Sequence, residues 1–240
     1  MNTRSAIRGP EGVATGLPAA VAACAPYAVW MALMIALPGT ACSYAARAVA
    51  SLAVLAAAAA VLAKCARSRP ETGRSLFWPT GAVAAVVAGI GVAVLWIAPE
   101  YSEFYRRWFV VGDCPAPGSG AASPFDPDVC GWPLALARLA GSAFVIAPAE
   151  ELFFRFFLYR FLQSRDWMRQ GLRRFDLQAF IWSVGLFALE HDRPAAAVVA
   201  GAIYTCTYIR FGFAAACVAH ALTNFILGVF VLATASWAFW

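Results

Sequence analysis

Long apolar runs separated by short polar gaps dominate this sequence and restrict its fold more than any other feature. The runs cover about residues 17–38, 44–63, 78–98, 133–163, 175–190, 195–209 and 213–235. Most of them reach the roughly 20 residues that a helix needs to cross the hydrocarbon core of a bilayer. Because only helices and closed barrels satisfy their backbone in lipid, we predict an all-α, polytopic transmembrane helical bundle of about seven spans, within a range of six to eight.

Composition and charge exclude the main soluble classes. Hydrophobic residues make up 62% of the chain and charged residues 13%, against about 25% charged in soluble domains. The net charge of +5 comes from arginines in short gaps, not from a continuous basic face, so nucleic-acid binding is not expected and the lipid bilayer is the expected environment. The cysteines form no C-x-x-C pair. Cys114 and Cys130 share one polar loop, and whether they pair stays open.

The distribution of basic residues predicts one topology. The N-terminus, the gaps at 64–77 and 164–174, and the turn at Arg210 are expected on the cytoplasmic side. The acidic, proline-rich segment at 99–131 and the C-terminus are then expected outside. An N-terminus in the cytoplasm satisfies this pattern for seven spans.

The same polar segment divides the chain into two regions. Residues 1–131 form an N-terminal membrane region with three spans and the acidic loop. Residues 132–240 form a core of four spans. Every chemical motif lies in this second region, which is therefore the expected functional part.

The fourth apolar run carries three charges that lipid tolerates poorly. They are Glu150, Glu151 and Arg155, and an ionised group at the bilayer centre costs about 3 kcal/mol or more. Glu151 and Arg155 are four residues apart, so they share a helix face and can form an ion pair. Glu150 points about 100° away from that face and is the acid available for chemistry.

Both histidines of the chain lie at comparable depth in other runs. His220 and Asn224 are four residues apart, as are Phe187 and His191. At about 1.5 Å per helical residue, His191, Asn224 and Glu150 each lie about 21 Å from the inner boundary, and His220 about 15 Å. A carboxylate and a histidine can deprotonate a water, and a histidine with an amide can stabilise an oxyanion.

These three motifs resemble the CAAX prenyl protease and bacteriocin-processing family of glutamic intramembrane proteases. In this chain they read Glu150-Glu151-Leu-Phe-Phe-Arg155, Phe187-Ala-Leu-Glu-His191 and His220-Ala-Leu-Thr-Asn224. The C-terminal sequence AHALTNFILGVFVLATASWAFW is similar to the branch of that family associated with exosortase systems. The resemblance implies a hydrolase in the bacterial inner membrane, a membrane-associated peptide or protein substrate, and a link to protein sorting.

The resemblance also implies roles for single residues. Glu150 and His191 activate the water, and His220 with Asn224 stabilise the oxyanion. Glu190 beside His191 departs from the family pattern, and no prenyl-pocket signature is recognisable, so prenylated substrates are not implied.

Two further residues are expected to support the site, and other chemistries and functions remain as alternatives. By the same resemblance, Glu151 and Arg155 orient the catalytic groups. No H-E-x-x-H occurs and Arg155 disfavours a nearby dication, so no metal and no cofactor are expected, with a zinc-dependent membrane protease as the alternative chemistry. A non-catalytic immunity or scaffold protein and a proton-coupled transporter are the alternative functions.

A few residues near the motifs are interpreted as structural. Pro148 is the expected site of a kink. Arg138 is expected to extend to the headgroups, and Asp192 with Arg193 to form a solvated helix end. Trp240 is expected to anchor the chain at the membrane interface.

Overall fold

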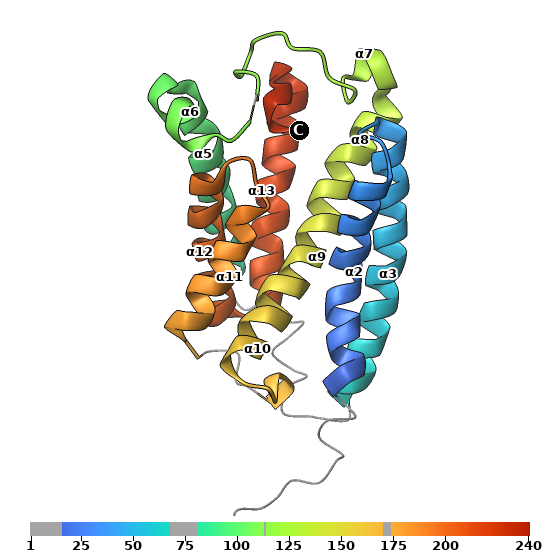
Figure 1. Cartoon of the computed structure of the whole chain (residues 1–240), viewed down its shortest axis with the longest axis vertical. Helices are drawn as coiled ribbons and strands as arrows, with labels where there is room; N and C mark the ends of the chain where they lie inside the picture. Colours follow the sequence, from blue (N-terminus) through green and yellow to red (C-terminus); the bar gives the residue numbers. More distant parts are fainter. Residues whose placement is uncertain (1–15, 68–80, 113, 170–173) are drawn as a thin grey trace, which may run out of the picture.

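The protein is described by a computed structural model over residues 16–67, 81–112, 114–169 and 174–240. Throughout these ranges the regular structure is helical and no strand occurs. The predicted all-α, polytopic bundle is therefore confirmed (Figure 1). The N-terminal residues and most of the basic gap at 64–77, both expected on the cytoplasmic side, lie outside the described residues.

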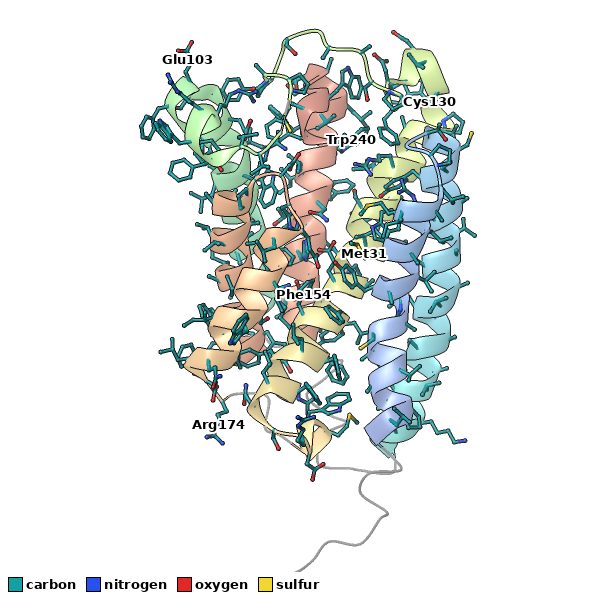
Figure 2. The ribbon with its side chains drawn as sticks, viewed as in Figure 1. Met31, Glu103, Cys130, Phe154, Arg174 and Trp240 are labelled. Atoms are coloured by element: carbon teal, nitrogen blue, oxygen red, sulfur yellow. The ribbon has the colours of Figure 1, made fainter. Side chains whose placement is uncertain are left out.

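Within the described residues, seven helical runs lie where the sequence predicts apolar runs, which is roughly consistent with about seven spans. They are α2 (Gly16–Ala36), α3 (Ala41–Arg67), α5 (Ala82–Ile97), the run Trp132–Gln163, α11 (Leu177–Leu189), α12 (Pro194–Phe211) and α13 (Phe213–Thr234). Five of the described helical runs are long and apolar enough to cross a membrane, while α11 is shorter. Large apolar side chains such as Ile35 and Val83 project outward from the helices, as Figure 2 shows for the bundle as a whole. The chain is an integral membrane protein.

The fourth run departs from regular α-helix on both sides of the paired acids. Its parts are α8 (Trp132–Gly141), η2 (Ser142–Ile146), α9 (Ala147–Glu151), η3 (Leu152–Tyr159) and α10 (Arg160–Gln163), of which η2 and η3 are π-helical. A kink was expected at Pro148, which lacks the N–H for a regular helical hydrogen bond. Just before it, Ala147 N–H donates to Ser142 O, five residues earlier, as in a π-helix. π-Helical turns are frequent at functional sites.

The long fourth run separates two groups of helices (Figure 1). On one side α2 pairs with α3, and these pack on η3 and α8; on the other, α13 packs on α5, α9 and α12. Small residues allow close approach: Thr223 Oγ1 donates to Gly89 O at 2.9 Å. A Cβ at Gly89 would lie 2.7 Å from Ala219 O. This contact holds α13 in a fixed position beside the acids.

Short elements gather at the two ends of the bundle. The end that carries the acidic segment holds η1 (Ala98–Tyr101), α6 (Glu103–Phe109), α7 (Pro127–Cys130) and η5 (Trp237–Phe239) (Figure 1). The opposite end holds α10 and η4 (Trp167–Arg169). We call the first the loop end. The described parts of the acidic segment and of the basic gap, the latter at 164–169 and 174, therefore lie at opposite ends, as the charge pattern predicts.

Candidate active site

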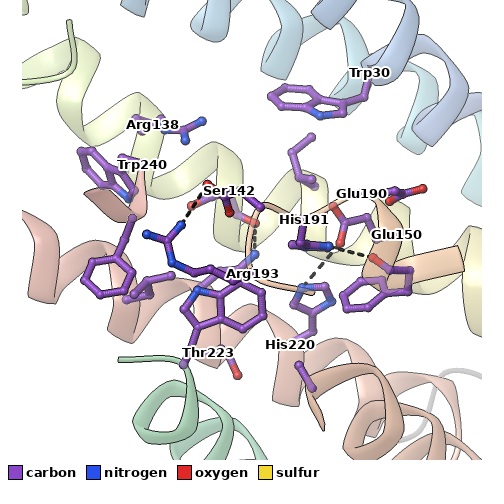
Figure 3. Close-up of a pocket in the computed structure, with 18 of the residues that line it drawn as sticks. Trp30, Arg138, Ser142, Glu150, Glu190, His191, Arg193, His220, Thr223 and Trp240 are labelled. Atoms are coloured by element: carbon purple, nitrogen blue, oxygen red, sulfur yellow. Dashed lines mark hydrogen bonds and ion pairs between the residues drawn. The ribbon is translucent and has the colours of Figure 1, made fainter. Parts of the chain in front are cut away.

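One cavity of about 450 Å³ collects the polar groups of three separate helical runs. Its lining includes Glu150 from α9, His191 from the turn between α11 and α12, and His220 and Asn224 from α13 (Figure 3). Residues that are 74 positions apart in the sequence thus meet around one space. The sequence predicts these four residues as the catalytic set, and their roles stay a prediction.

The neighbouring ion pair lies behind the cavity wall. Glu151 and Arg155 have fully buried side chains, and Arg155 Nη1 lies 3.2 Å from Glu151 Oε1. Arg155 Nη2 donates to Gly201 O at 3.3 Å, and its guanidinium lies 4.4 Å from the centre of the Phe187 ring. The guanidinium is the counter-charge of the buried Glu151 carboxylate, and such a pair costs less to bury than a lone charge.

His220 bridges the two acids. Its Nδ1 lies 2.9 Å from Glu151 Oε1, and because an ionised carboxylate only accepts, Nδ1–H is the donor. Nε2 then faces Glu150 Oε2 at 3.6 Å, and Figure 3 shows the two side chains pointing toward one another. This exceeds hydrogen-bond length. The Tyr204 ring stacks on the imidazole at 4.5 Å, which fixes its orientation.

His191 is oriented by the carbonyl one turn before it. Its Nδ1 lies 2.8 Å from Phe187 O, and a carbonyl only accepts, so Nδ1–H is again the donor. In the neutral ring Nε2 is therefore an unprotonated acceptor. The backbone carbonyl of the residue four before the histidine thus determines which ring nitrogen can take a proton, and the Phe187 ring itself packs against the imidazole at 4.6 Å. The Trp96 ring packs against the same imidazole at 5.5 Å.

Asn224 joins α13 to the π-helical turn ahead of the acids. Its Nδ2 donates to Ser142 O at 3.0 Å, the same carbonyl that accepts from Ala147. A primary amide carries two N–H groups, so one remains after this bond. The side chain is thereby held at the cavity wall with a donor to spare.

Arg193 is a cavity residue that the sequence interpretation placed wrongly. Its side chain is 2% exposed and does not form a solvated helix end. Nε donates to Glu100 Oε1 at 2.9 Å, Nη1 to Asp192 Oδ2 at 2.9 Å and Nη2 to Ala238 O at 2.8 Å. Asp192 itself is half exposed, as expected. Glu100 lies 93 residues before Arg193, so no local spacing could reveal the pair.

The two loop cysteines are free thiols, which answers the question that the sequence left open. Cys114 Sγ donates to Asp192 Oδ2 at 3.2 Å. Burial, together with this hydrogen bond, raises the pKa of the Cys114 thiol. The loop that carries Cys114 is therefore attached to the residue that follows His191.

Arg138 and Trp240 also line the cavity, which the sequence did not predict. The Arg138 guanidinium lies over the rings of Tyr44 at 4.3 Å, Phe125 at 4.6 Å and Trp240 at 5.8 Å, and it lines the cavity. Trp240 likewise lines the cavity rather than pointing only toward lipid. The aromatic rings of Tyr44 and Phe125 come from segments that sequence spacing does not connect to Arg138.

A metal needs at least three converging ligands in a protein site. Within the described part of the chain, no three His, Cys, Asp or Glu side chains lie close enough together to hold one.

The fold and the cavity define the class: a polytopic α-helical membrane protein with acid, imidazole and amide groups around a space inside the bundle. Residues 132–226 match the model of the family described as type II CAAX prenyl endopeptidase, Rce1-like. This match to a family of membrane endopeptidases, over the second region of the chain, confirms the resemblance found in the sequence. It contains all three motifs. Searches among curated proteins and among solved structures found no match.

Proposed function

We propose that the chain is a glutamic-type intramembrane endopeptidase that hydrolyses a peptide bond of a membrane-anchored or membrane-proximal substrate. The observation that carries the proposal is the shared cavity of Glu150, His191, His220 and Asn224. The family match to membrane endopeptidases supports it. The substrate enters from the loop end, because the cavity extends to Arg193 and Trp240 there.

In this mechanism a water lies between the Glu150 carboxylate and His191 Nε2. Glu150 takes a proton as the water oxygen attacks the scissile carbonyl carbon, and later gives it to the leaving amine. His191 holds the water as an acceptor, since its Nδ1–H is engaged by Phe187 O. The products are a carboxylic acid and an amine, so one water is consumed for each bond cleaved.

The developing oxyanion receives hydrogen bonds from the free N–H of Asn224 and from His220. Because Nδ1 of His220 already donates to Glu151, a donor on Nε2 requires the cationic ring. The buried carboxylate of Glu151 stabilises that cation. Glu151 thus supports the site through His220, and Arg155 supports it through Glu151.

The test uses the full-length protein, purified and reconstituted in liposomes. Its probe is a pool of single-span peptides with randomised sequence beside the span, and cleavage is read by mass spectrometry. Glu150→Gln keeps the shape of the side chain, and we expect at least a roughly 100-fold loss of rate for it and for His191→Ala. The matched control is Glu103→Gln on the exposed face of α6. Cleavage by both variants at the wild-type rate would refute the mechanism.

The same assay separates the alternatives. Loss of activity on exhaustive chelation, restored by zinc, would support a zinc-dependent protease. Absence of cleavage in every pool, with a partner protein bound stoichiometrically, would support an immunity or scaffold role.

We also propose that the protein resides in the bacterial inner membrane with its N-terminus in the cytoplasm. The acidic segment 99–131 then lies outside, together with the cavity opening. A protein-sorting system of the exosortase type is the proposed source of substrates. Cysteine labelling of Cys114 in intact cells, compared with lysed cells, measures the orientation; labelling only after lysis would contradict it.

A further inference from the structure

The cavity follows one face of the fourth helical run for several turns. Arg138, Ser142, Ile146 and Glu150 are spaced by four residues, and all four line it. At about 1.5 Å per residue, the backbone positions of Arg138 and Glu150 are about 18 Å apart. The cavity therefore extends from the acid toward the loop end, with Arg138 near its far limit.

Arg138 is a charge without an acid at this limit. Among the described residues no carboxylate forms an ion pair with it, and its Nε is buried without a hydrogen-bond partner. The other arginine of the lining, Arg193, binds both Glu100 and Asp192. Aromatic faces compensate a partly buried guanidinium only in part, so Arg138 retains capacity for an anion.

A second arginine adds to the positive potential. Arg47 is buried, and its guanidinium lies 5.0 Å from the Trp30 ring and 5.6 Å from the Tyr44 ring, the same ring that Arg138 covers. No described carboxylate pairs with Arg47 either. Two guanidiniums around one tyrosine repel each other, and an anion between them and the cavity relieves that repulsion.

We propose that Arg138 forms a carboxylate-binding subsite that takes an acidic group of the peptide substrate about five residues from the scissile bond. This inference rests on the proposed function. The planar fork of a guanidinium binds a carboxylate through two parallel hydrogen bonds. An extended peptide spans about 3.3–3.6 Å per residue, so about five residues cover the 18 Å between Glu150 and Arg138. The carboxylate belongs to a chain terminus or to an acidic side chain.

Binding is measured on Glu150→Gln protein in nanodiscs of zwitterionic lipid, so that cleavage plays no part. The probes are dansyl-labelled apolar hexapeptides that differ only in a terminal carboxylate or carboxamide, and energy transfer from tryptophan reports binding. We expect the carboxylate to bind about 10-fold more tightly, which is about 1.4 kcal/mol. In Arg138→Gln the ratio falls to about one, whereas Arg107→Gln, on the exposed face of α6, keeps it.

The ratio of carboxylate to carboxamide affinity within one variant distinguishes loss of the subsite from misfolding, because the carboxamide peptide still binds to a folded cavity. If Arg138→Gln binds neither peptide, Arg138→Lys is measured instead, and we expect it to give an intermediate affinity ratio. Equal binding of both peptides by the parent protein, or a ratio that persists in Arg138→Gln, would overturn the proposal. A second pair with an amidated end and a Glu or Gln side chain distinguishes the source of the carboxylate.

A lipid phosphate is the competing occupant. If anionic lipid in the nanodisc removes the carboxylate preference of the parent protein at every peptide concentration, Arg138 binds a headgroup and the proposal fails. The outcome is separate from that of the cleavage assay. A carboxylate preference without cleavage refutes the protease, while cleavage without any carboxylate preference refutes the subsite alone.

Discussion

Arg155→Met is the substitution that most directly tests how the buried charges are held. The two side chains of the Glu151–Arg155 pair are fully buried, so solvent does not screen them. Methionine keeps most of the apolar stem of Arg155 and removes only the charge. Glu151 then retains His220 Nδ1–H as its hydrogen-bond donor but has no counter-ion.

Removing one partner of a buried ion pair costs about 3–5 kcal/mol. The expected loss is near the lower value, about 3 kcal/mol, because residues four apart on one helix can still pair when the bundle is unfolded. In the double variant Glu151→Gln/Arg155→Met no bare charge remains. What is lost there is the cation–π contact with Phe187 and the bond to Gly201 O, about 1–2 kcal/mol.

The assay is unfolding of the purified full chain in mixed micelles titrated with sodium dodecyl sulfate and followed by tryptophan fluorescence. Arg107→Met, on the exposed face of α6, is the control and is expected within about 0.5 kcal/mol of wild type. If the single variant loses less than about 1 kcal/mol, or if the double variant is less stable than the single one, Glu151 does not carry a buried charge and this reasoning is wrong.

Three further outcomes follow from the contacts. In Gly201→Val the new Cβ would lie 3.0 Å from Phe187 Cδ1, so we expect about 1–3 kcal/mol of destabilisation in the same titration. In Asp192→Asn the raised pKa of Cys114 falls, so more thiolate is present at pH 8 and maleimide labelling, read by mass spectrometry, is faster; an unchanged rate contradicts this. Glu100→Gln removes one of the two carboxylates that pair with the buried Arg193 guanidinium. We expect the free energy of unfolding to fall by about 1–3 kcal/mol, and stability equal to wild type would contradict the importance of this pair.

The fold could be predicted from the sequence because lipid leaves few choices. Seven apolar runs with short gaps fix the number and limits of the helices to within a few residues. The π-helical segments around α9 were not predicted. At η2 a local feature, the missing N–H of Pro148, combines with a distant one, the hydrogen bond from Asn224 to Ser142 O.

The site could be predicted where spacing along one helix determines it. The ion pair of Glu151 with Arg155 and the orientation of His191 by Phe187 are both four-residue relations. Contacts between distant segments could not be predicted, because apolar helices of similar hydropathy give no signal for their pairing. Arg193 illustrates this limit: its acid lies on η1, and from sequence alone the arginine is indistinguishable from a solvated helix end.

The adjacent acids differ in their surroundings because of the direction each takes from α9. Glu151 points to Arg155 and to His220 Nδ1, so that inside the bundle it has one cationic and one donating partner. Glu150 points into the cavity toward His220 Nε2. One imidazole therefore lies between both acids. In the proposed mechanism, Glu151 stabilises the cationic form of His220, and His220 acts on the oxyanion. It follows that Glu151→Gln should slow cleavage through His220 even though Glu151 touches no part of the cavity, whereas loss of stability without loss of rate would restrict Glu151 to a structural role.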